Sequence, residues 1–307
     1  MIQLTRIFLL SLLLLSCSKK VKYIDKEVNV NIVPLPKEVD VIESNKHILL
    51  PKKIKVFIDS NEKKILFDLI SKDFKRLSIS NSFELVTNKN RSNLSLEIDN
   101  KLEEEEYEIA VNNKVVIKGG SLSAIKIAKS TLLQLSETDN GRITFPIINL
   151  KDSPDAAYRG LLIDLARKWH KVETIYKLID LASFYKLNYL QFHLTDDQLF
   201  TFPSENFPKL QTKDKHYTKE ELLSFVNYAH QRGIIIVPEI DVPGHSMQFV
   251  KKYPEIFSIS DAESGGEDLF GGRVDFVNVL NMGKEEVYTS LEKLFIEVMD
   301  IFHTSPY

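Results

Sequence analysis

Apolar positions in the second half of this chain change their spacing in a regular order. Runs typical of buried or alternating strands are followed by segments in which apolar residues recur at helical spacing. In chain order, these strand-like and helix-like segments are residues 158–167, 172–182, 187–198, 218–228 and 233–237. The order strand, helix, strand, helix, strand indicates right-handed crossovers and a parallel sheet.

The first half has shorter units of mixed type. Residues 48–58, 94–98 and 143–150 have strand character, and residues 107–117 predict a hairpin that turns at Asn112-Asn113. Apolar faces at helical spacing predict helices near residues 65–77 and 122–135. Together these features predict a small α+β domain over residues 31–152. The run Glu103–Glu106 is interpreted as a solvated loop.

A second domain is predicted for residues 153–307. The boundary falls at residues 151–155, which are polar and broken by Pro154. Residues 233–237 indicate a strand with both faces covered. Thr218 and Glu221 form a capping-box pattern ahead of one helix, and residues 284–302 predict another.

Charged residues gather where the predicted parallel strands end. His193, Asp196 and Asp197 close one strand, and Glu239, Asp241 and His245 follow another. In α/β architectures such ends lie beneath the loops of the active face, so these side chains predict a site. A second interpretation remains open, with Asp241 as a helix N-cap and His245 as an exposed turn residue. Since no Gly-rich phosphate loop follows these strands, a nucleotide-binding sheet loses support.

Three ordered motifs resemble the family 20 glycoside hydrolases, the β-N-acetylhexosaminidases. The motifs are Arg159-Gly160 with Asp164 and Arg167, then His193-Leu194-Thr195-Asp196-Asp197-Gln198, then Pro238-Glu239-Ile240-Asp241-Val242-Pro243-Gly244-His245. The resemblance implies an α+β domain followed by a (β/α)₈ TIM barrel. It also implies removal of terminal N-acetylglucosamine or N-acetylgalactosamine from β-linked glycans, with the substrate's own acetamido oxygen as the nucleophile.

The resemblance also implies a role for individual residues. Arg159 would hold sugar hydroxyls, with a strand-end arginine paired to an acid as the alternative. Asp196 would be a carboxylate near the sugar, and His193 would lie close to the site as a hydrogen-bonded strand-end histidine. Asp241 would orient His245, which would contact the catalytic acid. Asp197 is equally compatible with a loop cap, and Glu239 with a salt-bridge partner at the barrel mouth.

The family's general acid and the aspartate that polarises the acetamido group stand in a His-x-Gly-Gly-Asp-Glu motif, and the 307 residues contain no such motif. The resemblance places this catalytic pair beyond Tyr307, at the end of a fourth strand. After the helix at 284–302, residues 303–306 predict a turn and Tyr307 the first residue of that strand.

We therefore expect an incomplete barrel of three βα units in a C-terminally truncated chain that is inactive as given. The alternative is a non-catalytic remnant with at most weak glycan binding. The DNA sequence beyond codon 307 would distinguish a partial record or frameshift from a true short product.

The amino terminus has the pattern of a secretory signal. Arg6 precedes the apolar run Ile7–Leu15, which is too short to span a bilayer, and Leu14-Leu15-Ser16-Cys17 resembles a bacterial lipobox. Residues 1–17 are therefore interpreted as a lipoprotein signal, with Cys17 as the lipidated residue and residues 18–30 as a tether. This predicts a lipid-anchored protein of the bacterial cell envelope, outside the inner membrane.

Composition also limits the classes of ligand and partner that this chain is expected to bind. The formal net charge of −3 does not favour nucleic acid. Cys17 is the sole cysteine, and no Cys/His spacing suggests structural zinc. The sequence implies no cofactor. A metal-dependent hydrolase would need a cluster such as His193, Asp196 and His245 around one ion, for which the sequence has no dedicated spacing.

Overall fold

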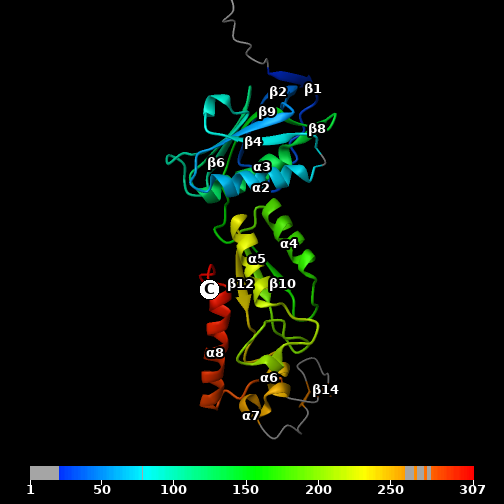
Figure 1. Ribbon diagram of the computed structural model, residues 1–307, viewed down its shortest axis with the longest axis vertical. Helices are drawn as coiled ribbons and strands as arrows, with labels where there is room; N and C mark the ends of the chain where they lie inside the picture. Colours follow the sequence, from blue (N-terminus) through cyan, green and yellow to red (C-terminus); the bar gives the residue numbers. More distant parts are fainter. Residues whose placement is uncertain (1–20, 78, 260–265, 268–272, 275–277) are drawn as a thin grey trace, which may run out of the picture.

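The computed structural model describes residues 21–77, 79–259, 266–267, 273–274 and 278–307, which form two units packed end to end (Figure 1). Each unit has its own cluster of buried apolar side chains. The first unit is built on a mixed sheet and the second on a parallel one. The described part of the chain contains no helix long and apolar enough to cross a membrane.

The first unit contains, within the described residues, a sheet of nine strands in the order β1-β2-β9-β6-β7-β5-β3-β4, with β8 paired to β9. Strands β3, β4, β5 and β7 are parallel, whereas β1, β2, β6 and β9 join antiparallel. The strands are β1 Lys22–Asp25, β2 Glu38–Leu49, β3 Lys53–Ile58, β4 Ser82–Val86, β5 Leu94–Ile98, β6 Tyr107–Val111, β7 Val115–Gly119, β8 Glu137–Asp139 and β9 Arg142–Asp152.

Several predicted elements of this unit are confirmed, and one is corrected. The strand at residues 94–98 and the hairpin that turns at Asn112-Asn113 are present. The predicted tether is too long, because β1 lies inside it and pairs with β2 from Lys22↔Leu49 to Asp25↔Lys46. Sequence reasoning missed β1, β4, β8 and the part of β2 before Ile48. β1 and β4 are short edge strands, and the side chains of β1, β4 and β8 are mostly exposed or half-buried.

Two helices, α2 (Lys63–Lys75) and α3 (Leu122–Leu135), cover the face of the sheet that is turned toward the second unit (Figure 1). A short 3₁₀ turn, η2, spans Lys89–Arg91. One row of cross-strand neighbours alternates in charge over five strands, in the order Glu97, Lys118, Glu108, Lys151 and Glu38. Opposite charges side by side stabilise a sheet surface that faces water, so this row is suited to a solvated face.

The second unit is organised around the parallel sheet β10-β11-β12. Helix α4 joins β10 to β11, and α5 joins β11 to β12, as the alternating pattern predicts. The elements are β10 Gly160–Asp164, α4 Val172–Phe184, β11 Tyr189–His193, η3 Pro208–Leu210, α5 Lys219–Gln231, β12 Ile235–Glu239, α6 Met247–Lys252, α7 Pro254–Phe257, β13 Gly266–Glu267, β14 Arg273–Val274 and α8 Glu285–Ile301.

Local sequence signals explain where α5 begins. The Thr218 hydroxyl accepts a hydrogen bond from the Glu221 backbone N–H at 3.1 Å, and the Glu221 carboxylate accepts one from the Thr218 backbone N–H at 2.9 Å. This reciprocal pair is the capping box predicted from the sequence, and it satisfies two backbone donors that a helix start leaves free.

The expectation that residues 233–237 are covered on both faces is wrong for the described residues. Ile234 and Ile236 are buried, but Ile235 and Val237 are only half-buried. In β10, Leu161 and Leu162 are 42% and 51% exposed. Helices α4 and α5 pack against one side of this sheet. Within the described part of the chain, the other side of the sheet and its free edge at β10 are not covered.

The turn predicted after α8 is present, but Tyr307 is not part of a strand. The Ser305 backbone N–H donates to the Phe302 carbonyl at 2.8 Å, which closes the turn. The Tyr307 backbone N–H donates to the Ser305 hydroxyl at 3.4 Å, so it takes a local partner instead of one in a neighbouring strand. A strand requires backbone pairing across a ladder, so the prediction that Tyr307 opens a strand stays a prediction.

The ring of Tyr307 packs at the amino ends of the parallel strands. Its centroid lies 6.0 Å from that of Tyr189, which begins β11, and 6.4 Å from that of Tyr158, which precedes β10. The side chain is 72% exposed. These edge contacts hold the segment after α8 at the end of the sheet that faces the first unit.

Polar contacts join the two units. Arg159 makes a bidentate ion pair with Glu105, with both N–O distances at 2.9 Å. The Lys186 ammonium donates to Asp152 at 3.1 Å, and both side chains are largely buried. The acidic run 103–106 is therefore not simply a solvated loop, because Glu105 crosses to the second unit. These contacts lie at the amino ends of the parallel strands.

Candidate functional site

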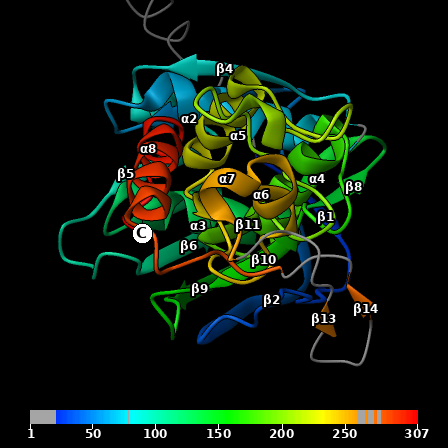
Figure 2. The same cartoon turned by 90° about the horizontal axis from the view of Figure 1, so that it is seen from below.

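The carboxyl ends of the three parallel strands carry a row of ionisable side chains. Asp164, His193 and Glu239 are cross-strand neighbours, since Asp164 pairs with His193 in the β10–β11 ladder and His193 with Glu239 in the β11–β12 ladder. This end of the sheet points away from the first unit (Figure 1), and Figure 2 looks onto it from the side of α6 and α7. The parallel fold therefore brings together side chains that are far apart in the sequence.

Asp196 is the centre of this cluster. Its Oδ2 atom forms an ion pair with Arg167 Nη2 at 2.7 Å and lies 2.9 Å from His193 Nε2. Its Oδ1 atom accepts from the Asp197 backbone N–H at 2.6 Å and lies 3.3 Å from His245 Nδ1. The side chain is 1% exposed, so burial and four partners fix this carboxylate in one orientation.

The cluster has a solvent-facing layer and a buried layer. Arg167 and His245 are 49% and 47% exposed, whereas His193 is 5% exposed and lies behind them with Asp196. A planar guanidinium that is held by carboxylates on one side and exposed to solvent on the other is suited to binding hydroxyl or carbonyl oxygens of a ligand. The buried layer orients the two groups that a ligand can reach.

Arg167 is held from two sides. Its Nη1 atom donates to Asp164 Oδ2 at 2.7 Å, and Asp164 Oδ1 accepts the backbone N–H groups of Ala166 and Arg167. The hydrogen bond to Asp164 raises the pKa of Arg167. Burial alone would raise the pKa of Asp164, but the hydrogen bonds from Arg167 outweigh it and hold that pKa below its ordinary value of 3.8. The pair is therefore ionised at neutral pH.

The predicted pairing of Asp241 with His245 is not found. His245 contacts Asp196, while the Asp241 backbone N–H donates to Thr195 Oγ1 at 2.9 Å. His245 adopts a left-handed φ of 52°, in the turn after Pro243. That turn points the imidazole back toward the loop that follows β11. The carboxylate that orients His245 is therefore the one at position 196.

Asp197 has the loop-capping role that the sequence left open. Its Oδ1 atom accepts the backbone N–H of Met247 at 3.2 Å, and its Oδ2 atom accepts the side-chain amide of Asn278 at 2.9 Å. Gln248 adds a hydrogen bond from its amide to the Asp197 carbonyl at 2.7 Å. Sequence reasoning missed Asn278, since its partner is 81 positions away and nothing in the local pattern marks it.

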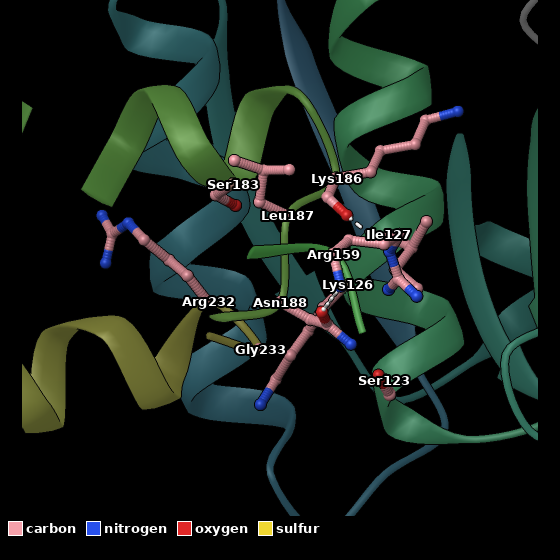
Figure 3. Close-up of a pocket in the computed structure, with 10 residues that line it drawn as sticks. All are labelled: Ser123, Lys126, Ile127, Arg159, Ser183, Lys186, Leu187, Asn188, Arg232 and Gly233. Carbon is pink, nitrogen blue, oxygen red and sulfur yellow. Dashed lines mark hydrogen bonds between the residues drawn. The ribbon is translucent and has the colours of Figure 1, made fainter. Parts of the chain in front are cut away.

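Arg159 does not lie in this cluster. It precedes β10 at the opposite end of the sheet, where its Nε donates to the Lys186 carbonyl at 2.9 Å and its backbone N–H to Asn188 Oδ1 at 2.8 Å (Figure 3). The cavity drawn in Figure 3 has a volume of about 10 Å³. Such a volume holds about one water molecule and no sugar. The predicted sugar-binding role of Arg159 is therefore corrected to the alternative, an arginine paired with an acid.

Two groups of described residues bring potential metal ligands within 4.8 Å of one another. They are His193 with Glu239 and Asp241, and Asp196 with Asp197 and His245. His193 uses both ring nitrogens for carboxylates, and Asp196 is already bound to a guanidinium. A cation in either group would have to displace these hydrogen bonds, so the donor set fits a hydrogen-bonded network better than a metal centre.

Comparison with known protein families matches nearly the whole chain. Residues 157–307 match the model of the glycosyl hydrolase family 20 catalytic domain, and residues 29–153 match that of glycosyl hydrolase family 20, domain 2. A β-hexosaminidase of Porphyromonas gingivalis is 28% identical over 316 aligned positions, covering 94% of this chain and 40% of that protein. A β-hexosaminidase of Vibrio furnissii is 31% identical, covering 66% of this chain and 36% of that protein.

The fold is shared with solved structures. An exo-β-N-acetylglucosaminidase of family 20 from Vibrio harveyi, in complex with N-acetylglucosamine, superimposes with a TM-score of 0.80 and 26% identity. The match covers 93% of this chain and 48% of that one. The chain thus spans about two fifths of the curated relatives and about half of the solved structure.

Proposed function

Because the chain belongs to glycosyl hydrolase family 20, we propose that its function is that of an exo-acting β-N-acetylhexosaminidase. Such an enzyme removes terminal N-acetylglucosamine or N-acetylgalactosamine from β-linked glycans. One observation carries the proposal beyond family membership. Arg167 and His245 are presented to solvent at the carboxyl ends of three parallel strands by one buried carboxylate, Asp196. Active sites on barrels of this kind are built at that end of the strands.

The proposed division of labour follows from these contacts. The Arg167 guanidinium binds sugar oxygens, since its fork of donors is fixed from below by Asp164 and Asp196. Asp196 orients His245, and we propose that this imidazole contacts the catalytic acid. In the substrate-assisted route, the acetamido oxygen of the sugar attacks the anomeric carbon. The acid and the polarising aspartate belong to a motif that these 307 residues do not contain, and we propose that it follows Tyr307.

We also propose that the three βα units are the first three of a (β/α)₈ barrel, with domains at residues 31–152 and 153–307. Open apolar surface supports this proposal. Leu161 and Leu162 on β10, and Phe295 and Met299 on α8, are between 38% and 68% exposed. In a closed barrel, neighbouring strands and helices cover such positions.

Sugar binding and turnover by the full chain test the proposed function separately. N-acetylglucosamine is titrated against the protein and observed by ligand NMR, and hydrolysis is followed with a chromogenic β-N-acetylglucosaminide. We expect binding without turnover from these residues. Arg167→Met is expected to weaken binding about tenfold, the equivalent of one lost charge-assisted hydrogen bond, whereas Lys168→Met, which removes a neighbouring exposed cation, leaves it unchanged.

Each outcome has a clear meaning. Equal binding by the wild type and by Arg167→Met would contradict the proposed sugar contact. Turnover at a rate usual for such enzymes would show that a general acid is present within these residues. Hexosaminidase relatives match both halves of the chain, which favours a hexosaminidase whose catalytic pair follows Tyr307 over the alternative, a non-catalytic remnant with at most weak glycan binding.

We propose that Cys17 is lipidated and anchors the protein in the bacterial cell envelope. Support comes from the sequence Leu14-Leu15-Ser16-Cys17 after a short apolar run. Cys17 lies outside the described residues. A clickable fatty-acid probe is expected to label the wild-type chain expressed in bacteria and not Cys17→Ser. Equal labelling of the two chains would contradict lipidation at this residue.

A further inference from the structure

His193 lies between two carboxylates at the end of β11. Its Nε2 atom is 2.9 Å from Asp196 Oδ2, and its Nδ1 atom is 2.9 Å from Glu239 Oε1. The other oxygen of Glu239 accepts the Gln191 amide at 2.6 Å, so Glu239 is itself held in place. With a side chain that is 5% exposed, His193 has little water available as a replacement partner.

The chemistry of the ring restricts its protonation state. A neutral imidazole has one N–H donor and one lone pair, so it can donate to only one of two carboxylates. The other carboxylate would then face a lone pair at hydrogen-bond distance in a buried position. An imidazolium donates to both. We propose that His193 is a positioning residue, a doubly protonated imidazolium that bridges Glu239 to Asp196 and so fixes the carboxylate that holds Arg167 and His245.

The carboxylates around His193 favour its protonated form. Asp164 faces it from β10, Asp196 from its own loop, and Glu239 and Asp241 from β12 and the loop after it. Arg167 is the cation bound to the same oxygen of Asp196. Four carboxylates thus surround one guanidinium and this ring, and a positive His193 reduces the excess of negative charge.

The pKa of His193 agrees with the geometry. Burial disfavours the charged ring, but the hydrogen bonds to Asp196 and Glu239 outweigh it and raise the pKa above the ordinary 6.5. A base whose pKa is raised by folding stabilises the native state fully below its unfolded pKa. That stabilisation is lost as pH rises through the folded pKa. The bridge is therefore complete in mildly acidic solution and breaks as pH rises past the folded pKa.

The consequence for the site lies in the orientation of Asp196. His193 and Arg167 share Oδ2, while the Asp197 N–H and His245 share Oδ1. Removing the donor at His193 frees one side of the carboxylate and allows it to turn. The position of His245 then changes through Asp196, without direct contact from His193. This inference rests on the proposed function only in assigning the sugar to Arg167 and the catalytic acid to His245.

Histidine NMR of the full, ¹⁵N-labelled chain tests the proposal. The chain has seven histidines, and His193→Gln assigns the relevant signals. We expect both ring nitrogens of His193 to be protonated at pH 6.5, with a titration midpoint above 6.5 that moves downward in Glu239→Gln. A midpoint below 6.5, or an unchanged midpoint in that variant, would overturn the proposal.

The positioning role has a separate readout in the signals of His245. We expect His193→Gln to shift them, because the carboxamide places an oxygen against one carboxylate. In the double variant His193→Gln/Glu239→Gln, the amide introduced at position 239 can donate to the carboxamide oxygen introduced at position 193. We therefore expect the His245 signals to return part of the way to their wild-type positions. The control is His216→Gln, which should leave the His245 signals in place. His216 lies outside the cluster, with its ring Nδ1 2.9 Å from the Thr212 carbonyl. Unmoved His245 signals in His193→Gln would refute the positioning role.

These experiments separate the inference from the proposed function. A protonated His193 in a chain that does not bind N-acetylglucosamine would contradict the proposed function and leave the bridge intact. A neutral His193 in a chain that binds the sugar would contradict the bridge and leave the proposed function intact.

Discussion

Two arginines of one segment have different roles because they stand at opposite ends of a strand. Arg159 precedes β10 and Arg167 follows it, and the five strand residues between them extend over roughly 16 Å at about 3.3 Å per residue. Arg159 is held by Glu105 and by backbone carbonyls, whereas Arg167 reaches Asp196. The residue type suits sugar binding at both positions. Only its place along the strand decides which arginine can meet a ligand.

Acidification is expected to loosen the turn that presents Arg167. Hydrogen bonds from Arg167 hold the pKa of Asp164 below 3.8, so the stabilisation is present above that pH and is lost as pH falls through the lower folded value. Asp164→Asn should lower the free energy of unfolding by roughly 1 kcal/mol at pH 7 and by less at pH 3. Denaturant unfolding at both pH values measures this. Asp155→Asn, at a 90% exposed carboxylate, is the control. Equal losses at the two pH values would contradict the expectation.

At the scale of elements, helical periodicity located the helices but overstated how much of each is covered. The pattern in residues 284–302 predicts one broad apolar face. In α8, Val287, Leu294 and Val298 are buried, whereas Phe295 and Met299 on the same predicted face are 38% and 68% exposed. Periodicity reports which side of a helix is apolar. The neighbouring elements determine how much of that side is buried.

Helix α5 is expected to depend on Phe225 for its packing. This ring is fully buried and makes edge contacts with Tyr176, Tyr217 and Phe192 at centroid distances of 5.3, 5.6 and 6.4 Å. Phe225→Ala should lower the free energy of unfolding by about 3–5 kcal/mol, because the cavity adds to the lost transfer energy. Phe295→Ala, at an exposed position, should cost less than about 1 kcal/mol. Denaturant titration of both variants checks this, and similar losses would be inconsistent with the packing described.

At the scale of the whole molecule, ion pairs connect two units that have separate cores. Arg159–Glu105 and Lys186–Asp152 lie at the amino ends of the parallel strands, and Arg76, the C-cap of α2, pairs with Asp180 of α4. The Ser130 hydroxyl adds a hydrogen bond to the Ser183 carbonyl at 2.8 Å. The site lies at the other end of the strands, so the first unit supports the second from the side opposite the cluster.

Breaking the pair between the units is expected to destabilise both. Arg159→Met leaves Glu105 without its bidentate partner and removes the donor to the Lys186 carbonyl. The loss should be roughly 2 kcal/mol, between the values for exposed and fully buried pairs. Thermal unfolding with hydrogen exchange over β10 and β11 measures it. The control Lys53→Met breaks the exposed pair with Glu84. Unchanged exchange in Arg159→Met would contradict this coupling.

The sequence by itself determined the local elements and the family. The capping box of α5, the hairpin at Asn112-Asn113 and the order of strands and helices depend on residues a few positions apart, so a local pattern is sufficient to predict them. The sequence also located the charged strand ends. Parallel strands place those ends together, which is why Asp196 and His245 were both found.

Only the tertiary structure decided the partners. His245 meets Asp196 across 49 positions, although Asp241 is nearer in the sequence, and Arg159 meets Glu105 across 54. Tyr307, predicted as the start of a strand, packs its ring against Tyr189. Each of these outcomes depends on the direction of a side chain and on the packing of a second element, which no local pattern contains. Residue types therefore identified the chemistry available to this chain, and the fold determined which residues can carry it out.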